Sequence, residues 1–328
     1  MKEALYSEPG AEGSVSCSLC PLGCSISPSR HGQCGVRVNR NTRLVSMTWG
    51  RVSTEEVIPV EAVPLYHFHP GSRVLLVGSM GCTMRCPFCS TWRVSLMGTR
   101  TRFLAPEDLV LLAREKEVQG VVFGVNEPLL FFEFIMDAAP LLREAGFFVA
   151  INTNGFMNTA PLFDLLSVSD AFLVDFKGFT EEFYQSVTGG YLREIQRAVF
   201  SMNVKTHLEL SALVIGDVND KDEPMDEFLR WVAHLQPAPP PLHLLQYRPS
   251  YQYTKPPTDT MRMYYLHEKA RRMLPYVYLS NMEGREANTT YCPSCKKPLI
   301  IRTVGDRRSF NLDGDQCVKC GTKISLVK

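Results

Sequence analysis

Short apolar runs alternate with amphipathic stretches through the middle of the chain. Six of these runs predict strands, at 74–78, 120–125, 147–152, 171–176, 207–215 and 242–247. Most are almost continuously apolar, which is typical of parallel strands buried on both faces. Helices are predicted between them, and in the clearest one Met225, Phe228 and Val232 recur at helical spacing behind an acidic start.

Six strands that alternate with helices predict an α/β fold with a parallel sheet. A closed eight-fold barrel needs about 250 residues, which is more than the segment 72–282 contains. We therefore predict that 72–282 forms a partial, open (β/α)6 barrel of the TIM type. Small cysteine-rich modules at 1–50 and 283–328 flank this barrel, and a connector at 51–71 precedes it.

The composition is that of a globular chain with a sizeable core, since 45% of the residues are apolar and 21% are charged. The formal net charge of +1 gives no overall field that would attract nucleic acid or an anionic membrane. No stretch approaches the ~20 apolar residues that span a bilayer. The N-terminus also lacks the apolar core of a secretory signal, so we expect a cytoplasmic protein.

Eleven cysteines fall into groups of four, three and four along the chain. Because the cytosol disfavours structural disulfides, metal binding or catalysis is the leading interpretation. Sets of four thiolates suit closed tetrahedral sites, whereas a set of three leaves one coordination position open. The groups are Cys17, Cys20, Cys24 and Cys34; Cys82, Cys86 and Cys89; and Cys292, Cys295, Cys317 and Cys320.

The middle group has the spacing C-x3-C-x2-C and directly follows the first predicted barrel strand. This position lies at the carboxyl end of the strand, where the active sites of barrels form. Three thiolates can hold three irons of a [4Fe–4S] cluster and leave the fourth iron free to bind a substrate. A structural zinc site or a reactive thiol loop is the alternative, and the position after the first strand counts against it.

Polar residues also follow the later strands at the same edge of the predicted barrel. Each group has a simpler interpretation by itself, as a helix start, a turn or a structural ion pair. Because the carboxyl ends of the strands meet at one mouth, we expect the groups to form a single ring. In chain order they are Asn126 and Glu127, Asn154, Asp175 and Lys177, and Gln246 and Arg248.

The loop Gly81-Cys82-Thr83-Met84-Arg85-Cys86-Pro87-Phe88-Cys89 resembles the signature of radical S-adenosylmethionine (SAM) enzymes. In that superfamily SAM chelates the open iron, and an electron from the cluster yields methionine and a 5′-deoxyadenosyl radical. This radical abstracts hydrogen from a substrate. The resemblance therefore implies a [4Fe–4S] cluster on Cys82, Cys86 and Cys89, SAM as cosubstrate, and an external one-electron reductant.

The same resemblance implies roles for the residues of the ring. The segment 123–128 is similar to the Gly-Gly-Glu motif that meets the SAM ammonium, although two glycines are absent, and it implies this role for Asn126 and Glu127. The Asp175-Phe176-Lys177 segment is similar to the Asp-x-Lys element of glycyl-radical activases, and it implies contacts with the carboxylate and ribose side of SAM. The predicted cofactor-binding set is completed by Phe88 beside the adenine, Asn154, Gln246 and Arg248.

A closer resemblance extends over nearly the whole chain. The blocks at 66–71, 126–128 and 175–184, with the two flanking cysteine modules, resemble the radical SAM protein of the AmmeMemoRadiSam system. That family is related to pyruvate formate-lyase activating enzymes, which implies a partner protein as one candidate substrate and leaves a small molecule as the other. Departures from the family pattern lie near the predicted cavity, at 90–92, 123–125 and 246–248.

The flanking modules differ in their cysteine spacing. The C-terminal pattern C-x2-C…C-x2-C predicts a zinc ribbon, in which two knuckles supply two thiolates each; rubredoxin-like iron or no metal is the alternative. The N-terminal pattern C-x2-C-x3-C-x9-C also fits zinc, and its long gap suits a structural clip. An auxiliary iron–sulfur cluster remains the open alternative for this module.

Two function classes emerge from these patterns. The leading hypothesis is a radical SAM enzyme that abstracts hydrogen from an unknown substrate. The rival is a non-enzymatic zinc-ribbon protein that binds nucleic acid or protein, with zinc in all its sites and no iron. The nearly neutral charge and the ring of strand-end residues count against this rival.

Overall fold

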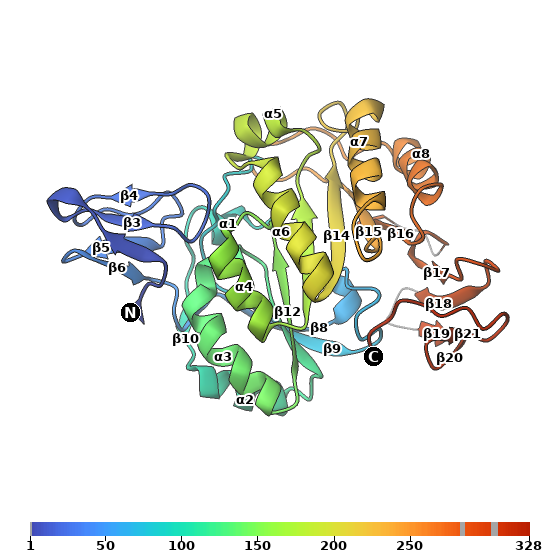
Figure 1. Ribbon diagram of the computed structural model, residues 1–328, viewed down its shortest axis with the longest axis horizontal. Helices are drawn as coiled ribbons and strands as arrows, with labels where there is room; N and C mark the ends of the chain where they lie inside the picture. The colour runs from blue at the N-terminus through green and yellow to red at the C-terminus, as the bar shows by residue number, and fades with distance from the viewer. Residues whose placement is uncertain (1, 283–285, 303–307) are drawn as a thin grey trace.

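The computed structural model describes residues 2–282, 286–302 and 308–328. Figure 1 shows an N-terminal module and a C-terminal ribbon at opposite ends of the long axis, with a core of sheet and helices between them. Parts of the predicted C-terminal zinc ribbon, at 283–285 and 303–307, lie outside the described residues.

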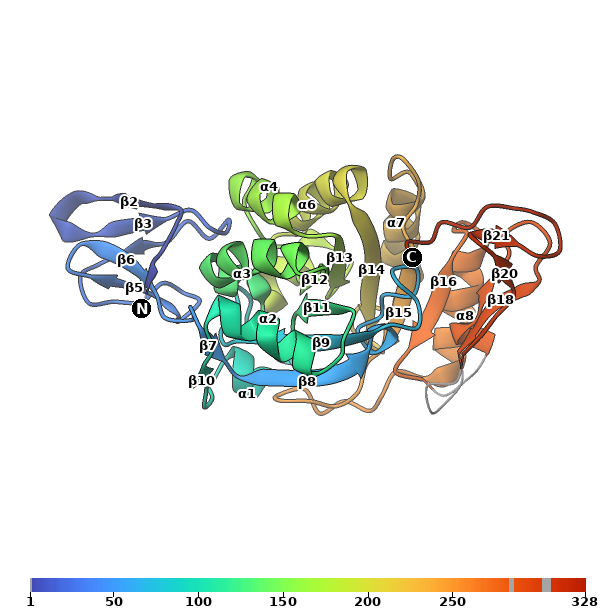
Figure 2. The same ribbon diagram turned by 90° about the horizontal axis from the view of Figure 1, so that it is seen from below.

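One eight-stranded sheet forms the centre of the core. Its neighbours from β9 to β16 pair in parallel, whereas β8 runs antiparallel to β9. The order is linear rather than closed on itself, so the curved sheet is a partial, open barrel (Figure 2). In spatial order the strands are β16 (Val277–Ser280), β15 (Leu242–Gln246), β14 (His207–Val214), β13 (Ala171–Phe176), β12 (Phe148–Thr153), β11 (Gly120–Phe123), β9 (Arg73–Gly78) and β8 (Thr54–Pro59).

Helices connect successive parallel strands and cover the outside of the sheet (Figure 2). They are α1 (Trp92–Ser95), α2 (Pro106–Glu115), α3 (Phe132–Glu144), α4 (Thr159–Val168), α5 (Glu181–Phe183), α6 (Leu192–Lys205), α7 (Asp222–Ala233) and α8 (Thr260–Arg271). The predicted apolar face of α7 is buried against the sheet. Among the helices of the described residues, none combines the length and the apolar surface that a bilayer crossing requires.

The predicted α/β fold with an open parallel barrel is confirmed, and all six predicted strands are present. The structure adds two strands to the sheet. One is β8, which lies within the segment 51–71 and forms a half-exposed edge whose polar positions weaken the strand pattern. The other is β16, which has four residues and is too short to give a clear sequence signal.

The strands are buried on both faces, as their continuous apolar character predicts. In β11, the side chains of Val121 and Phe123 join the large core between the sheet and the helices. Val122 points the other way and belongs to a smaller cluster with Leu65 and Phe68 from the segment before β9. This segment contributes apolar side chains to the barrel interior.

The N-terminal module consists of two small antiparallel sheets, each with three strands. It is fastened to the core by an ion pair between the buried side chains of Arg37 and Glu133, and by the side-chain amide of Asn158, which donates to the carbonyl of Ser18 at 2.7 Å. Its strands are β1 (Lys2–Glu3), β2 (Ser7–Pro9), β3 (Val15–Cys17), β4 (Ser25–Ile26), β5 (Arg37–Arg40) and β6 (Arg43–Ser46). A further pair, β7 (Arg51–Val52) and β10 (Arg102–Phe103), lies next to it.

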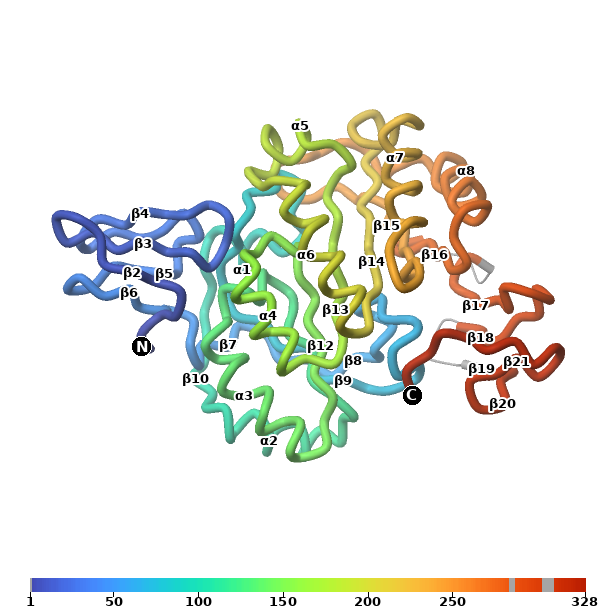
Figure 3. Tube along the Cα trace, in the orientation of Figure 1, coloured from blue at the N-terminus to red at the C-terminus, as the bar shows by residue number. Residues whose placement is uncertain are grey.

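The ribbon packs against the amino ends of the barrel strands. The end of the chain lies beside the segment before β9 (Figure 3), where the backbone N–H of His69 donates to the carbonyl of Val327 at 2.7 Å. The ribbon has its own small apolar cluster, which includes Tyr276 and Tyr278 of the core. Its strands are β17 (Thr290–Tyr291), β18 (Pro298–Arg302), β19 (Arg308–Phe310), β20 (Leu312–Asp313) and β21 (Gln316–Cys317).

Candidate active site

The middle three cysteines lie on the loop between β9 and α1, which we call the cysteine loop (residues 79–91). Bonds from distant segments fix its shape: the N–H of Arg85 donates to the carbonyl of Thr188 at 2.8 Å, and the Ser250 hydroxyl donates to the carbonyl of Cys89 at 3.0 Å. Gly81 has a φ of +88°, a conformation that favours glycine. The loop is therefore held in one shape by its own glycine and by the opposite side of the barrel mouth.

A cavity of about 420 Å³ opens at the carboxyl ends of the strands, next to this loop. All the residues that the sequence analysis assigned to the active site line it. They are Cys82, Cys86, Phe88, Cys89, Asn126, Glu127, Asn154, Asp175, Lys177, Gln246 and Arg248. The expected ring of strand-end residues is thus brought to one place, while the individual role of each residue stays a prediction.

Glu127 is a buried carboxylate with several protein donors. Its Oε1 accepts from the backbone N–H of Leu129 at 3.0 Å and from the Thr153 hydroxyl at 2.7 Å, and its Oε2 accepts from the N–H of Asn154 at 2.9 Å. Burial raises the pKa of Glu127, although these bonds act in the opposite direction. A carboxylate has about four acceptor positions, so one remains for a ligand.

Asn126 holds the start of the cysteine loop. Its Oδ1 accepts from the N–H of Ser79 at 2.8 Å, and its Nδ2 donates to the carbonyl of Gly81 at 3.1 Å. The preceding Val125 has a φ of +71°, which strains a β-branched residue. A Cβ on Gly78 would lie 2.9 Å from the Cβ of Val125, so this approach requires glycine on β9.

Asp175 and Lys177 form an ion pair beside the cysteines, with 3.3 Å between Nζ and Oδ2. Burial lowers the pKa of Lys177, but Asp175 and Cys86 raise it by more, so it lies above its usual range. Burial raises the pKa of the Cys86 thiol to about 12, and Lys177 opposes that shift. Lys177 is therefore a permanent cation at physiological pH, and bound metal would be needed to make Cys86 a thiolate.

Asn154 faces the cysteine loop directly. Its Nδ2 donates to the Thr83 hydroxyl at 3.1 Å and lies 3.7 Å from the Cys82 sulfur, within reach of a weak hydrogen bond. Gln246 and Arg248 contact backbone instead of the cysteine loop: the Gln246 side chain donates to the carbonyl of Thr258 at 2.7 Å, and Arg248 donates to the carbonyl of Asn281 at 2.8 Å. Among the strand-end residues, Asn154 is thus the one whose side-chain amide lies against a cysteine sulfur.

Sequence reasoning missed two residues that position Asp175 and Lys177. The Asn152 amide donates to Oδ2 of Asp175 at 3.2 Å, and the hydroxyl of Tyr184 accepts from the backbone N–H of Lys177 at 2.9 Å. Asn152 lies two positions before Asn154, and alternate residues of a strand share one face. The sequence therefore offered a signal that Asn152 faces the cavity. Tyr184 reaches back through an irregular helical turn (Tyr184–Thr188), and spacing gives no signal for that contact.

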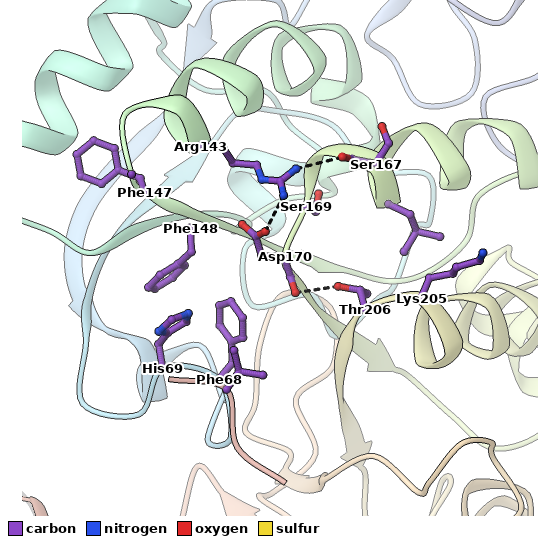
Figure 4. A pocket seen from close by; sticks show the side chains of 13 residues that line it. Phe68, His69, Arg143, Phe147, Phe148, Ser167, Ser169, Asp170, Lys205 and Thr206 are labelled. Carbon is purple, nitrogen blue, oxygen red and sulfur yellow. Dashed lines mark hydrogen bonds and ion pairs between the residues drawn. The ribbon is translucent and has the colours of Figure 1, made fainter. Parts of the chain in front are cut away.

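A larger groove of about 670 Å³ lies at the opposite end of the barrel (Figure 4). It has none of the predicted site residues. Arg143 forms an ion pair with Asp170 at 3.3 Å and donates to the carbonyl of Ser167 at 3.1 Å (Figure 4). The charges of this groove are therefore partly paired within the protein, and the cavity beside the cysteines is the better candidate for chemistry.

The two flanking cysteine groups differ in geometry. The sulfurs of the ribbon all lie within 4.8 Å of one another, at Cys292, Cys295, Cys317 and Cys320. This arrangement suits one tetrahedral metal ion. The four N-terminal cysteines instead line a small internal cavity together with Arg37.

Comparisons with known proteins agree with this site. Residues 76–232 match the family described as the radical SAM superfamily. An uncharacterized protein of Methanocaldococcus jannaschii is 31% identical over 339 aligned residues, which cover 100% of both chains. A pyruvate formate-lyase-activating enzyme of Clostridium pasteurianum is 31% identical over 165 residues, or 47% of this chain and 66% of that protein.

The fold also resembles solved structures. A radical SAM methyltransferase from Sphaerobacter thermophilus has a TM-score of 0.52 and 21% sequence identity over 66% of this chain and 68% of that chain. Streptococcus suis SuiB, solved with bound S-adenosylmethionine, has a TM-score of 0.52 and 16% identity over 66% of this chain and 53% of that chain. These likenesses concern the fold of the barrel.

Proposed function

We propose that Cys82, Cys86 and Cys89 bind a [4Fe–4S] cluster and that SAM binds in the adjoining cavity. The premise is that this chain belongs to the radical SAM superfamily and is an enzyme of that class. When bound, these cofactors supply a 5′-deoxyadenosyl radical that removes a hydrogen atom from a substrate. The observation that carries the proposal is the single cavity that all the predicted residues line.

The residues present fit these cofactors. Three thiols lie at the cavity wall, and no fourth cysteine lines it, so a cluster held there would keep one iron open for SAM. The Asn154 amide lies close enough to the Cys82 sulfur to donate to it, and donors to a cluster sulfur raise its reduction potential. The donor set therefore suits an iron–sulfur cluster with an exchangeable position.

The charged residues divide the recognition of SAM between them. Lys177 keeps its proton and would pair with the SAM carboxylate. The Lys177 ammonium is held by Asp175, which in turn accepts from the Asn152 amide. Glu127 uses two acceptor positions at Thr153 and Asn154, at the end of β12, and a third at the N–H of Leu129 in its own segment. The fourth is available to the SAM ammonium. Asn126 contributes by shaping the cysteine loop.

Zinc is the metal that we propose for the ribbon. Sulfur pairs in the ribbon are 3.6 Å apart, and four sulfurs about 2.3 Å from one zinc ion would be separated by ~3.8 Å. The backbone N–H of Cys295 donates to the Cys292 sulfur at 3.5 Å, as in a metal knuckle. The ion supplies folding free energy to a module whose own apolar cluster is small.

The relatives named as activating enzymes favour a partner protein as the substrate. A small molecule is the competing hypothesis. The comparisons do not favour the non-enzymatic zinc-ribbon protein. The narrower assignment to the AmmeMemoRadiSam system stays a prediction from the sequence resemblance.

The proposed function is tested on protein purified without oxygen. After iron and zinc are counted, dithionite and SAM are added, and 5′-deoxyadenosine is measured by mass spectrometry. We expect iron in the protein and formation of 5′-deoxyadenosine, and we expect Cys86→Ala to abolish this product. Wild-type protein that binds zinc but no iron, and that leaves SAM intact, would refute the proposal.

The substrate class is tested with deuterium. A cell extract from a fully deuterated culture is divided by size into a protein fraction and a small-molecule fraction, and each is added to the reaction. Deuterium that appears in 5′-deoxyadenosine with the protein fraction alone supports a partner protein. Deuterium from the small-molecule fraction alone contradicts it.

A further inference from the structure

The ribbon shows how four thiols look when they are arranged for one zinc ion. All its sulfurs lie within 4.8 Å of one another, and the distances are 3.6 Å between Cys292 and Cys320 and between Cys295 and Cys317. Across residues 2–282, 286–302 and 308–328, no other three histidine, cysteine or acidic ligands meet that limit. No three of the N-terminal thiols therefore lie within that distance of one another.

The N-terminal thiols line one small cavity. Cys17, Cys20, Cys24 and Cys34 line it with apolar side chains that include Leu130 of the core. Its volume of about 10 Å³ accommodates roughly one water-sized sphere. Four sulfurs at ~2.3 Å from one zinc ion would leave no such space. In an iron–sulfur cluster each cysteine sulfur binds a different iron, so the four sulfurs stand further apart than they do around one zinc ion.

A buried donor is directed at one of the N-terminal sulfurs. The Arg37 side chain is 1% exposed, and its Nη1 donates to the Cys17 sulfur at 3.6 Å. A donor to a cysteine sulfur favours the thiolate, which is the form that binds metal. These features fit a site that binds metal.

The N-terminal site lies directly against the cysteine loop. A Cβ on Gly81 would be 2.9 Å from Cγ1 of Val36 and 3.0 Å from Cδ1 of Leu130, and Leu130 also lines the N-terminal cavity. In addition, Arg85 of the loop donates to the carbonyl of Gln33 at 2.5 Å. The N-terminal site and the predicted catalytic cysteines therefore share one apolar wall.

We propose that Cys17, Cys20, Cys24 and Cys34 hold a second [4Fe–4S] cluster. The wide sulfur separation, the cavity between the sulfurs, the buried cation and the wall shared with the cysteine loop support this assignment. It reverses the preference for zinc that the sequence spacing gave. The proposal is independent of SAM chemistry, because it concerns a separate set of ligands.

The test is the metal content of a variant that cannot bind the catalytic cluster. In Cys82→Ala/Cys86→Ala/Cys89→Ala, reconstituted without oxygen, we expect about four irons and one zinc per chain. Reduction with dithionite is expected to produce the paramagnetic resonance signal of a reduced cluster. A variant without iron, whether it holds one zinc or two, overturns the proposal.

Wild-type protein and two matched variants make the test specific. We expect about eight irons and one zinc in the wild type, and four irons with two zincs would overturn the proposal even if the triple variant failed to fold. In the triple background, Cys20→Ser should lose the iron and keep the zinc. In the same background Cys292→Ser should lose the zinc and keep the iron. Iron that persists in the Cys20→Ser protein overturns the assignment.

Discussion

The N-terminal module meets the barrel beside the cysteine loop, at the carboxyl ends of the strands, whereas the ribbon covers the amino ends (Figure 1). Each module has four cysteines. In the N-terminal module these cysteines and their apolar neighbours belong to the same large core as the barrel, including Leu129 and Met84. In the ribbon, Cys292, Cys295 and Cys317 belong to a separate small cluster with three tyrosines of the core, Tyr66, Tyr276 and Tyr278.

This difference predicts different sources of stability. The N-terminal module gains free energy from apolar burial against the barrel and from one buried ion pair. The ribbon buries little apolar surface, so the metal ion that we propose for it would supply most of its folding free energy. One module is thus a continuation of the core, whereas the other has a small cluster of its own and would depend on the proposed metal ion.

The largest effect that this comparison predicts is the loss of zinc from the ribbon. Cys292→Ser removes one of four ligands, and structural zinc sites contribute on the order of 10 kcal/mol to folding. We expect the ribbon to unfold while the barrel stays intact, so that limited proteolysis releases a stable fragment that ends near residue 282. Mass spectrometry of the fragment and a zinc count measure this result.

Cys20→Ser is the matched control for that experiment. It changes the N-terminal site, and because apolar burial holds this module, we expect it to remain protease-resistant. If both variants lose their module equally, or if the ribbon of Cys292→Ser stays resistant, the two modules do not differ in the way that we describe.

The next largest effect concerns the buried ion pair of the N-terminal module. Arg37→Met leaves the Glu133 carboxylate buried without its cation, which should lower the free energy of unfolding by about 3–5 kcal/mol. Urea denaturation measures the change. In the double variant Arg37→Met/Glu133→Leu, both charges are absent, and we expect much of the loss to be recovered.

A half-exposed pair joins the same two parts of the chain and provides a control. Lys2 and Asp137 form an ion pair whose side chains are 39% and 34% exposed. We expect Lys2→Met to change the free energy of unfolding by less than about 1 kcal/mol. Equal effects of Arg37→Met and Lys2→Met would show that the buried pair does not anchor the module.

The sheet was largely predictable from the sequence, because strands buried on both faces leave an almost continuous apolar signal. The edge strand β8 gives no such signal, since Glu55 and Glu56 are exposed. The ring of site residues was also predictable, because parallel strands bring their carboxyl ends together. Its internal bonds were not, since Asn126 and Glu127 bind backbone groups whose position depends on the fold of other loops.

The identity of the metal at each cysteine group could not be predicted from the sequence either. The pattern C-x2-C establishes which side chains can be ligands, and it does so for both modules. It does not establish how far apart the sulfurs lie, because the separation depends on how each loop packs. In the N-terminal module, Arg37 and Leu130 at the cavity come from another part of the module and from the core. These tertiary contacts could not be predicted from cysteine spacing.

A smaller effect tests the wall between the N-terminal site and the cysteine loop. Gly81 and Gly35 both have a positive φ, +88° and +77°, so alanine costs about 1 kcal/mol at either position. At Gly81 the new methyl group also meets Val36 and Leu130, which adds about 1–3 kcal/mol of overpacking. At Gly35 no heavy atom lies within 4 Å of it.

We therefore expect Gly81→Ala to be the more destabilising variant in urea denaturation. Because Gly81 adjoins Cys82, we also expect Gly81→Ala to reduce 5′-deoxyadenosine formation by about tenfold or more, equivalent to at least ~1.4 kcal/mol. Gly35→Ala should retain near wild-type formation. If the two variants behave alike in both measurements, the contact between the module and the loop has no functional consequence.

The smallest effect is a pH dependence at the other end of the barrel, where the ribbon meets His67. The imidazole is fully buried; Nδ1 donates to the carbonyl of Ser325 at 2.7 Å, and Nε2 accepts from the hydroxyl of Tyr278 at 2.6 Å. Burial lowers the pKa of His67 to about 4, below its usual value of 6.5. The folded protein therefore keeps this histidine neutral in a range where the unfolded chain binds a proton.

This shift fixes the direction of the effect. Between about pH 6.5 and pH 4 the unfolded state binds more protons, so stability falls as the pH falls, by at most ~1.4 kcal/mol per pH unit. Nearby Glu209 has a pKa held far below its usual range by bonds from His207 and His243 despite burial, so its contribution to stability is lost only below about pH 4.5.

Urea denaturation from pH 7 to pH 5 with excess zinc should show a shallower pH dependence for His67→Gln than for the wild type. A control variant, His31→Gln, removes an exposed histidine of the N-terminal module, far from the ribbon interface. Equal slopes for His67→Gln and the wild type would mean that the ribbon interface does not titrate through this histidine.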